Sequence, residues 1–419
     1  MARLKQIVGA SAIALALSGT SGGVIFGQDA DAQNNVASLK QPRQLSNINA
    51  IAQRARAHVN PLAAQDTSNA FASTSDGIYA PGAKTGDGPA EQTYQARAFG
   101  TFGIPYTTTR VQVGNQSAPE ATVDNYLSTT YPYRAVGKLF FQVGAGSSHC
   151  SASVILRGVI VTAAHCIQDF GSGDTIFTNF VFLPGHYGAA DATEEQIAPY
   201  GTFVPFAVSR PQSWSDGTDP GCGAARENDL AVMAVPRNAE GQLIGDIVGM
   251  LNYGWNNLGF VSSPRTGDLN TAAISTLGYP GLMDGGAIMQ RTDGPTFTTT
   301  FCGDATTAEI PQLWQGSNLT GGASGGPWTV NFSGRNAVLS GGAVEGEQAI
   351  MAVVGVTSWG TADPNTPKDN FSSQFGQNTQ YPEPDYGGFG AGNIGSLINS
   401  LCSGPAPEGG TLASAGYCD

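Results

Sequence analysis

The chain has 419 residues, of which only 12% are charged, and it carries a formal net charge of −13 at pH 7. Nucleic acids and anionic membrane surfaces are bound through basic patches, so this acidic balance argues against both as partners. Typical globular proteins have about 25% charged residues, and the low charged fraction here accompanies 57 glycines.

The first 32 residues have the pattern of a secretory signal peptide. Arg3 and Lys5 precede an apolar stretch over residues 7–17, and Ala30-Asp31-Ala32 fits the small-residue cleavage pattern. Glycine and serine interrupt the apolar stretch, which falls short of the ~20 residues needed to span a membrane. We therefore expect residues 1–32 to be removed, and the mature protein to be secreted or periplasmic without membrane contact.

Residues 33–130 differ from the rest in charge and composition. They carry 7 basic and 6 acidic residues, whereas residues 131–419 carry 10 basic and 24 acidic residues. Apolar residues over 47–59 recur at helical spacing, and a stretch rich in Ala, Gly, Thr, Ser and Pro follows. Such a composition is usual in linkers and disordered segments. The segment fits a pro-segment, and it fits a flexible N-terminal extension nearly as well.

A hairpin that leads to a histidine is the first strong pattern of residues 131–419. Residues 150–156 and 159–161 are two β-rich runs about Arg157-Gly158, and Thr162-Ala163-Ala164-His165-Cys166 follows. A disulfide between Cys150 and Cys166 would hold the His165 loop, and closing a loop of this size is worth about 3 kcal/mol. His165 is a candidate catalytic base, and a satisfied core histidine is the alternative.

Asp229 and Ser324 are the other candidates for catalysis. Asp229 directly precedes the apolar residues 230–235, where a carboxylate is costly to bury unless a group such as an imidazole pairs with it. Ser324 lies in Gly321-Gly322-Ala323-Ser324-Gly325-Gly326, where glycines allow a sharp turn and leave N–H groups for an oxyanion. A loop carboxylate and a plain glycine-rich turn are the alternatives. All four histidines precede Ser324, which excludes the α/β-hydrolase order.

Together these motifs resemble those of the trypsin-like (chymotrypsin-fold) serine peptidases: His165 in TAAHC, Asp229 in NDLAV and Ser324 in GGASGGP, in that order. Leu277-Gly278-Tyr279-Pro280-Gly281 resembles the bacterial glutamyl-endopeptidase-like (V8-like) branch, and residues 356–360 resemble the substrate-binding strand of the family. The resemblance covers about residues 135–402, within a peptidase domain that we assign to residues 131–419.

The resemblance implies an all-β fold, a double six-stranded β-barrel of the chymotrypsin type with a C-terminal helix. The barrels would span about residues 135–235 and 271–402, with the active site between them. Short apolar runs broken by Gly, Pro, Asn and Asp agree with an all-β architecture. Residues 393–401 have one apolar face and fit the last helix.

The resemblance also implies an exported serine endopeptidase that hydrolyses polypeptide substrates through an acyl-enzyme. Ser324 would attack the scissile carbonyl, His165 would accept and return the proton, and Asp229 would orient the imidazole. The N–H groups of Gly322 and Ser324 would form the oxyanion hole. A non-catalytic homologue acting as a binding module and a serine esterase with the same triad are alternatives, and the intact triad argues against the first.

Six cysteines in an exported chain favour three disulfides. The pair Cys150–Cys166 agrees with the resemblance, Cys402 and Cys418 lie close in sequence, and Cys222 and Cys302 remain for the third. The chain has no cysteine or histidine pair at ligand spacing. We therefore expect no metal and no cofactor, and we expect a monomer.

The resemblance places the substrate-binding pocket beneath Ser358-Trp359-Gly360, with Thr357 before this strand and Asn318, Leu319 and Thr320 in one wall. Trypsin-type members have an aspartate at the Asn318 position, and glutamyl endopeptidases have a histidine where Thr357 stands and a threonine or serine where Leu319 stands. An alignment shifted by one residue would bring Thr320 to that last position. A pocket without a countercharge disfavours ions. We therefore expect cleavage after uncharged residues, apolar or aromatic.

Overall fold

The structure is a computed structural model, and it describes residues 33–40, 55–57, 100–111, 127–189, 192–262, 270–303, 309–332, 350–360 and 367–419. The predicted signal peptide, residues 1–32, lies outside this range, as does most of residues 33–130. Within the described ranges, no helix is long and apolar enough to cross a membrane.

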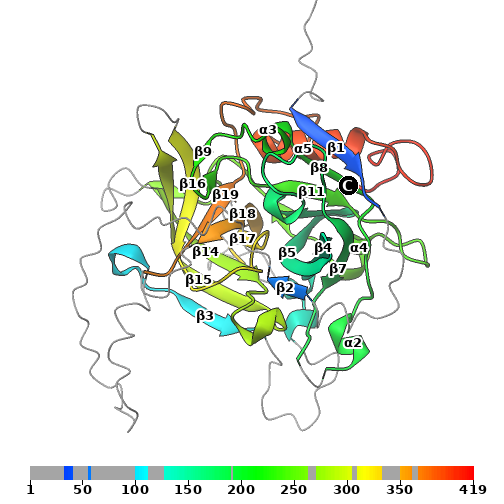
Figure 1. The fold of residues 1–419 in the computed structure, drawn as a ribbon, viewed down its shortest axis with the longest axis horizontal. Coiled ribbons are helices and arrows are strands. Elements are labelled where there is room, and N and C mark those ends of the chain that lie inside the picture. The colour runs from blue at the N-terminus through cyan, green and yellow to red at the C-terminus, as the bar shows by residue number, and fades with distance from the viewer. Residues whose placement is uncertain are drawn as a thin grey trace, which may run out of the picture.

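The first of two β-barrels that lie side by side is formed by residues 136–234 (Figure 1). Its six strands follow the order β8-β11-β6-β5-β4-β7. Phe182 and Phe203 exchange backbone hydrogen bonds of 2.7 and 3.0 Å, which closes the barrel between β7 and the segment before β8. The strands are β4 Val136–Val143, β5 Gly146–Leu156, β6 Val159–Thr162, β7 Thr178–Pro184, β8 Ala207–Pro211 and β11 Ala231–Ala234.

The second barrel has the strand order β14-β17-β18-β19-β16-β15, and a direct pairing of β14 with β15 closes it. Its strands are β14 Asn270–Gly278, β15 Gln290–Cys302, β16 Glu309–Gly316, β17 Pro327–Val330, β18 Ala352–Gly360 and β19 Asp369–Gln374. The all-β double six-stranded barrel predicted from the sequence is therefore confirmed.

Three strands that precede the first barrel in sequence pair with the two sheets. Strand β1 (Asn34–Ser38) pairs antiparallel with β8, β2 (Ala55–Ala57) pairs parallel with β5, and β3 (Thr107–Arg110) pairs antiparallel with β15. The helical spacing of residues 47–59 predicts a helix there. This prediction is wrong for residues 55–57, the part that the structure describes, because they form β2. Pairing with β5 supplies β2 with backbone partners, and such tertiary context overrides a weak helical pattern. Whether residues 33–130 are a pro-segment stays a prediction.

Helix α5 (Gly392–Ser403) is the predicted C-terminal helix, and it packs on β1, β8 and β11 of the first barrel (Figure 1). The side chains of Ile394, Leu397, Ile398 and Leu401 are fully buried. The short elements are α2 Glu194–Ile197, α3 Gln212–Asp216, α4 Ile244–Val248, β9 Gly221–Cys222, β10 Ala225–Arg226, β12 Asn252–Tyr253, β13 Val261–Ser262, η4 Thr101–Gly103, η6 Leu127–Thr129, η7 Tyr133–Ala135, η8 Ala164–Cys166 and η9 Asp284–Gly286.

Three disulfides join the described cysteines in the pairs that the sequence predicts: Cys150–Cys166, Cys222–Cys302 and Cys402–Cys418. The second links β9, in a loop of the first barrel, to β15 of the second. The third ties α5 to the C-terminal residues.

Candidate active site

His165 and Asp229 meet because the strands next to them pair. Strand β6 ends just before η8, which carries His165, and Asp229 lies just before β11. Since these strands are antiparallel, with Ala231 opposite Thr162, the two residues lie at the same end of the sheet. His165 Nδ1 is 2.7 Å from Asp229 Oδ2, and the His165 backbone N–H donates to Oδ1 at 2.9 Å. Both residues are buried.

The carboxylate of Asp229 has a further donor from the second barrel. Ser358, on β18, donates its hydroxyl to Asp229 Oδ2 at 2.6 Å. Three hydrogen bonds thus compensate a carboxylate that is 0% exposed, which would otherwise be costly to bury. The sequence predicts Ser358 only as part of the pocket strand and gives no sign of this contact, because no local pattern links two residues 129 positions apart.

Ser324 belongs to the glycine loop, residues 320–326, which contacts the segments that carry His165 and Ser358. The Ser324 carbonyl accepts from the N–H of Ser151 at 2.8 Å. A Cβ atom on Gly325 would lie 2.1 Å from Thr162 Oγ1 and 2.8 Å from the N of Ala163, so the loop lies against the end of β6. The N–H of Gly325 donates to the Thr357 carbonyl of β18 at 2.8 Å. The structure thus brings the loop of Ser324 to the base of the predicted triad.

The backbone N–H groups of the glycine loop fall into two sets. Those of Ala323, Gly325 and Gly326 donate to carbonyl oxygens. Those of Thr320, Gly321, Gly322 and Ser324 donate to no acceptor among the residues that the structure describes. Gly322 has φ +99°, which disfavours any residue with a Cβ. The two N–H groups predicted for the oxyanion hole therefore make no hydrogen bond within the described residues and can donate to an oxyanion.

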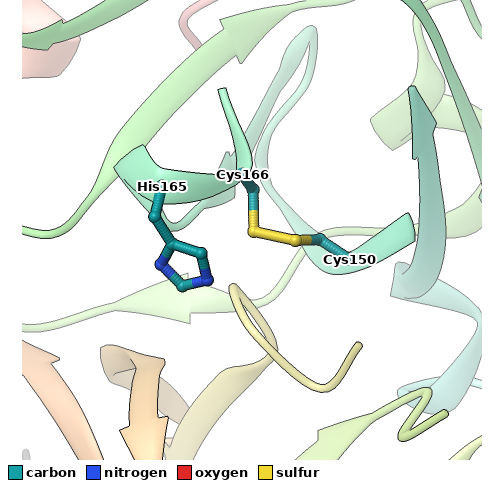
Figure 2. A group of neighbouring side chains, drawn as sticks. All are labelled: Cys150, His165 and Cys166. Carbon is teal, nitrogen blue, oxygen red and sulfur yellow. A yellow bond between two sulfur atoms is a disulfide. The ribbon is translucent and has the colours of Figure 1, made fainter. Parts of the chain in front are cut away.

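The imidazole of His165 lies beside the Cys150–Cys166 disulfide (Figure 2). The ligand atoms of His165, Cys150 and Cys166 lie within 4.8 Å of one another, the spacing of a metal site. However, both sulfur atoms are in the disulfide, whereas a metal requires thiolates. The disulfide instead joins the start of the hairpin to the residue after His165.

The residues predicted to form the pocket wall are mostly buried and already bonded. Thr108 Oγ1 donates to Asn318 Oδ1 at 2.6 Å, and Thr320 Oγ1 accepts from the N–H of Leu282 at 3.2 Å. Trp328 donates its indole N–H to Thr357 Oγ1 at 3.0 Å. The ring of Trp359 stacks on Phe371 with centroids 4.0 Å apart.

Asn370, which the sequence does not mark as a site residue, links this wall to Gly360 of β18. Its Nδ2 donates to the Leu319 carbonyl at 3.1 Å, and its Oδ1 accepts from Ser317 Oγ at 2.7 Å. A Cβ atom on Gly360 would lie 2.2 Å from Asn370 Nδ2, so the amide lies against Gly360. A neutral amide therefore joins Leu319 and Gly360. No local signal marks it, because Asn370 follows its wall residues by about fifty positions.

A buried polar network surrounds the residue before Asp229. Asn228 donates its N–H and its Nδ2 to the carboxylate of Asp219, both at 2.9 Å. Its Nδ2 also donates to Gln380 Oε1 at 2.8 Å. Burial raises the pKa of Asp219 to about 6, against the opposing effect of these hydrogen bonds. Burial, with Asp219 nearby, raises the pKa of Glu227 to about 7.

Three solved structures that are similar to this chain are proteases. The protease Anisep from Arthrobacter nicotinovorans is 21% identical over 59% of this chain and 93% of its own, with a TM-score of 0.41. The thermostable serine protease AL20 from an extremophilic microorganism is 22% identical over 58% and 92%, with a TM-score of 0.41. A Glu endopeptidase in complex with MPD is 17% identical over 64% and 91%, with a TM-score of 0.37. No protein-family model and no curated protein matches the chain.

The resemblance to chymotrypsin-fold serine peptidases is confirmed at the level of the fold by the two closed six-stranded barrels and the final helix. At identities below 25% and TM-scores below 0.5, only this chain's own residues can identify its chemistry.

Proposed function

We propose that this chain is an exported serine endopeptidase with the triad His165, Asp229 and Ser324. The observation that carries the proposal is the buried contact of 2.7 Å between His165 Nδ1 and Asp229 Oδ2, with the loop of Ser324 against the same segment. A carboxylate on Nδ1 leaves Nε2 to accept the proton of a serine hydroxyl. Three disulfides fit a protein that matures in an oxidising compartment.

In the proposed reaction, Ser324 Oγ bonds to the scissile carbonyl carbon while its proton moves to His165 Nε2. The carbonyl oxygen becomes an oxyanion, which the N–H groups of Gly322 and Ser324 bind. His165 then protonates the leaving amine, the C–N bond breaks, and an acyl-enzyme remains. Water, deprotonated by His165, hydrolyses this ester. Asp229 stays ionised and stabilises the imidazolium.

A fluorophosphonate probe and casein digestion test the proposal. We expect the probe to label the wild type at Ser324, and Ser324→Ala or His165→Ala to lose about 10⁶-fold in kcat. Ser209→Ala is the control, because this buried hydroxyl of β8 has no partner among the described residues. Near-normal casein cleavage by either triad variant would refute the assignment. Hydrolysis of nitrophenyl esters without casein cleavage would favour the esterase, and an unlabelled wild type would favour the non-catalytic homologue.

For specificity, we propose cleavage after uncharged residues. In the wall beneath Gly360, the neutral amide of Asn370 donates to the Leu319 carbonyl. The adjacent carboxylate of Asp369 already accepts hydrogen bonds from Thr101 and Trp314. An ion without a countercharge would be costly to desolvate there. Profiling with a peptide library measures the preference, and strong selection of Glu, Asp, Arg or Lys before the cut would refute it.

A further inference from the structure

The glycine loop rests on the segment that follows β14, which includes the motif Tyr279-Pro280-Gly281. The N–H of Gly281 donates to the Gly321 carbonyl at 2.7 Å. Because a peptide unit is planar, this bond also fixes the direction of the Gly322 N–H, which shares the plane of the Gly321 carbonyl. One proposed oxyanion donor is therefore oriented from Gly281.

Ser151, on β5, fixes two further peptide planes of the loop. Its hydroxyl accepts from the N–H of Tyr279 at 2.9 Å and donates to the Gly322 carbonyl at 2.9 Å. Its backbone N–H donates to the Ser324 carbonyl at 2.8 Å. Ser151 is fully buried, so water cannot replace these bonds without rearrangement. A single residue thus ties the glycine loop to the first barrel and to the Tyr279 segment.

The remaining plane is held within the loop itself. The carbonyl of Ala323, which shares a peptide plane with the Ser324 N–H, accepts from the N–H of Gly326 at 2.9 Å. The loop cannot shift toward its support either, because a Cβ atom on Gly322 would lie 2.5 Å from both His149 Nε2 and the Tyr279 carbonyl. If the Gly322–Ala323 peptide lost the Ser151 hydroxyl, only the bond from the Ala323 N–H to the Thr320 carbonyl, at 3.1 Å, would still hold it. A rotation of this peptide would disturb the planes on both sides.

We propose that Ser151 is a positioning residue of catalysis, whose hydroxyl holds the Gly322–Ala323 peptide of the glycine loop so that the neighbouring N–H groups of Gly322 and Ser324 stay directed toward the oxyanion. This inference rests on the proposed function, because the two N–H groups matter only if an oxyanion forms there. It also gives Tyr279-Pro280-Gly281 a role, as the platform from which the loop is oriented.

The test compares Ser151→Ala with Ser153→Ala. Ser153 lies two residues further along the same strand and is equally buried, and its hydroxyl has no partner within the described part of the chain. We expect kcat of Ser151→Ala to fall by about 10- to 100-fold, less than the 10²–10³ typical of removing a donor itself. KM should change by less than about twofold, since ground-state binding does not use these N–H groups. Ser153→Ala should keep the wild-type kcat.

The affinity for an inhibitor that forms an oxyanion distinguishes a positioning role of Ser151 from a purely structural role. Ser324 Oγ adds to the ketone carbon of a peptidyl trifluoromethyl ketone, its proton goes to His165, and the ketone oxygen becomes an oxyanion. Affinity for this inhibitor should fall by the same factor as kcat, whereas affinity for a product peptide should not change. Ser151→Thr keeps the hydroxyl and should restore most of the kcat.

Three outcomes would overturn the inference. If Ser151→Ala keeps kcat within about threefold of the wild type, the role of Ser151 is refuted while the proposed triad stands. An equal loss of affinity for the inhibitor and for the product peptide would have the same meaning. A wild type that the fluorophosphonate does not label at Ser324 would remove the proposed function and this inference together. If Ser151→Ala does not fold, Ser151→Cys carries the same test, because a thiol is a weaker donor than a hydroxyl. Wild-type kcat and inhibitor affinity in that variant would equally refute the role.

Discussion

At the scale of single residues, the main feature of the candidate site is the set of hydrogen bonds that stabilises the buried carboxylate of Asp229. The carboxylate of Asp229 accepts from His165 twice and from Ser358 once, and it is fully buried. Ser358 comes from the second barrel, whereas His165 and Asp229 belong to the first. The orientation of His165, the proposed base, therefore depends on contacts between the two barrels.

Removing the hydroxyl of Ser358 should weaken catalysis without unfolding the protein. A hydrogen bond to a charged group is worth about 1.5–3 kcal/mol, so we expect kcat/KM of Ser358→Ala to fall by about 10- to 100-fold. Thr329→Val is the control, since this buried hydroxyl of β17 has no partner among the described residues. An unchanged kcat/KM in Ser358→Ala would contradict the prediction.

Because of buried Glu227, the free energy of unfolding should fall as the pH rises. Burial raises its pKa to about 7, from 4.5 for an ordinary glutamate. Between these values the folded state holds a proton that the unfolded state releases, so the free energy of unfolding falls with increasing pH across this window. In Glu227→Gln this dependence should be weaker, as urea titrations at pH 4.5 to 7 can show. Exposed Glu240 is the control position, and equal slopes for wild type and Glu227→Gln would count against the assignment.

At the scale of elements, the sequence predicts those parts whose signals are local. The hairpin before His165 and the helix α5 follow from periodicity and short motifs. Strand β1 has no such signal, because its partners are distant: Asn34 donates to Ser396, 362 residues later. The same reason hides Ser151 and Asn370, whose roles depend on carbonyl groups of segments far away in sequence. What the sequence cannot predict is thus mostly contacts between distant segments.

Two disulfides of equal sequence separation allow two effects of removing a disulfide to be told apart: the effect on stability and the effect on His165. Cys150–Cys166 and Cys402–Cys418 both have a sequence separation of 16. Replacing either pair by serine should lower the free energy of unfolding by about 3 kcal/mol. Only loss of Cys150–Cys166 should also lower the kcat of the folded enzyme, because only this pair holds the His165 segment. Equal kcat in both variants, measured well below their melting temperatures, would speak against a tether.

Strand β1 should contribute to stability through one buried amide. Asn34 donates to Ser396 and Ser400 of α5 and accepts from the hydroxyl of Tyr381. Because Asn34→Ala removes these hydrogen bonds between buried groups, we expect a loss of about 1–3 kcal/mol in the free energy of unfolding. Asn35→Ala, at a surface contact with Asp174, should cost much less. Equal denaturation midpoints for the two variants would show that β1 is dispensable.

At the scale of the whole molecule, the two barrels are joined by covalent and polar links around the candidate site. The disulfide Cys222–Cys302 crosses from β9 to β15, and Gln312 of β16 donates to the Arg226 carbonyl at 2.7 Å. Ser151 and Ser358 make further links, each to a residue of the other barrel. The residues of the proposed triad thus lie close to the links between the two barrels.

Strands β1 and β2 precede Cys150, the first cysteine of the chain, so no covalent bond other than the backbone retains them. A single cut between Ala57 and Gly100 would convert the protein into a noncovalent complex of two polypeptides. Its integrity would then obey mass action, and dilution would release the shorter piece. Adding that piece back as a synthetic peptide would restore the assembled form with a measurable dissociation constant. A cut after β2 would therefore make stability depend on protein concentration.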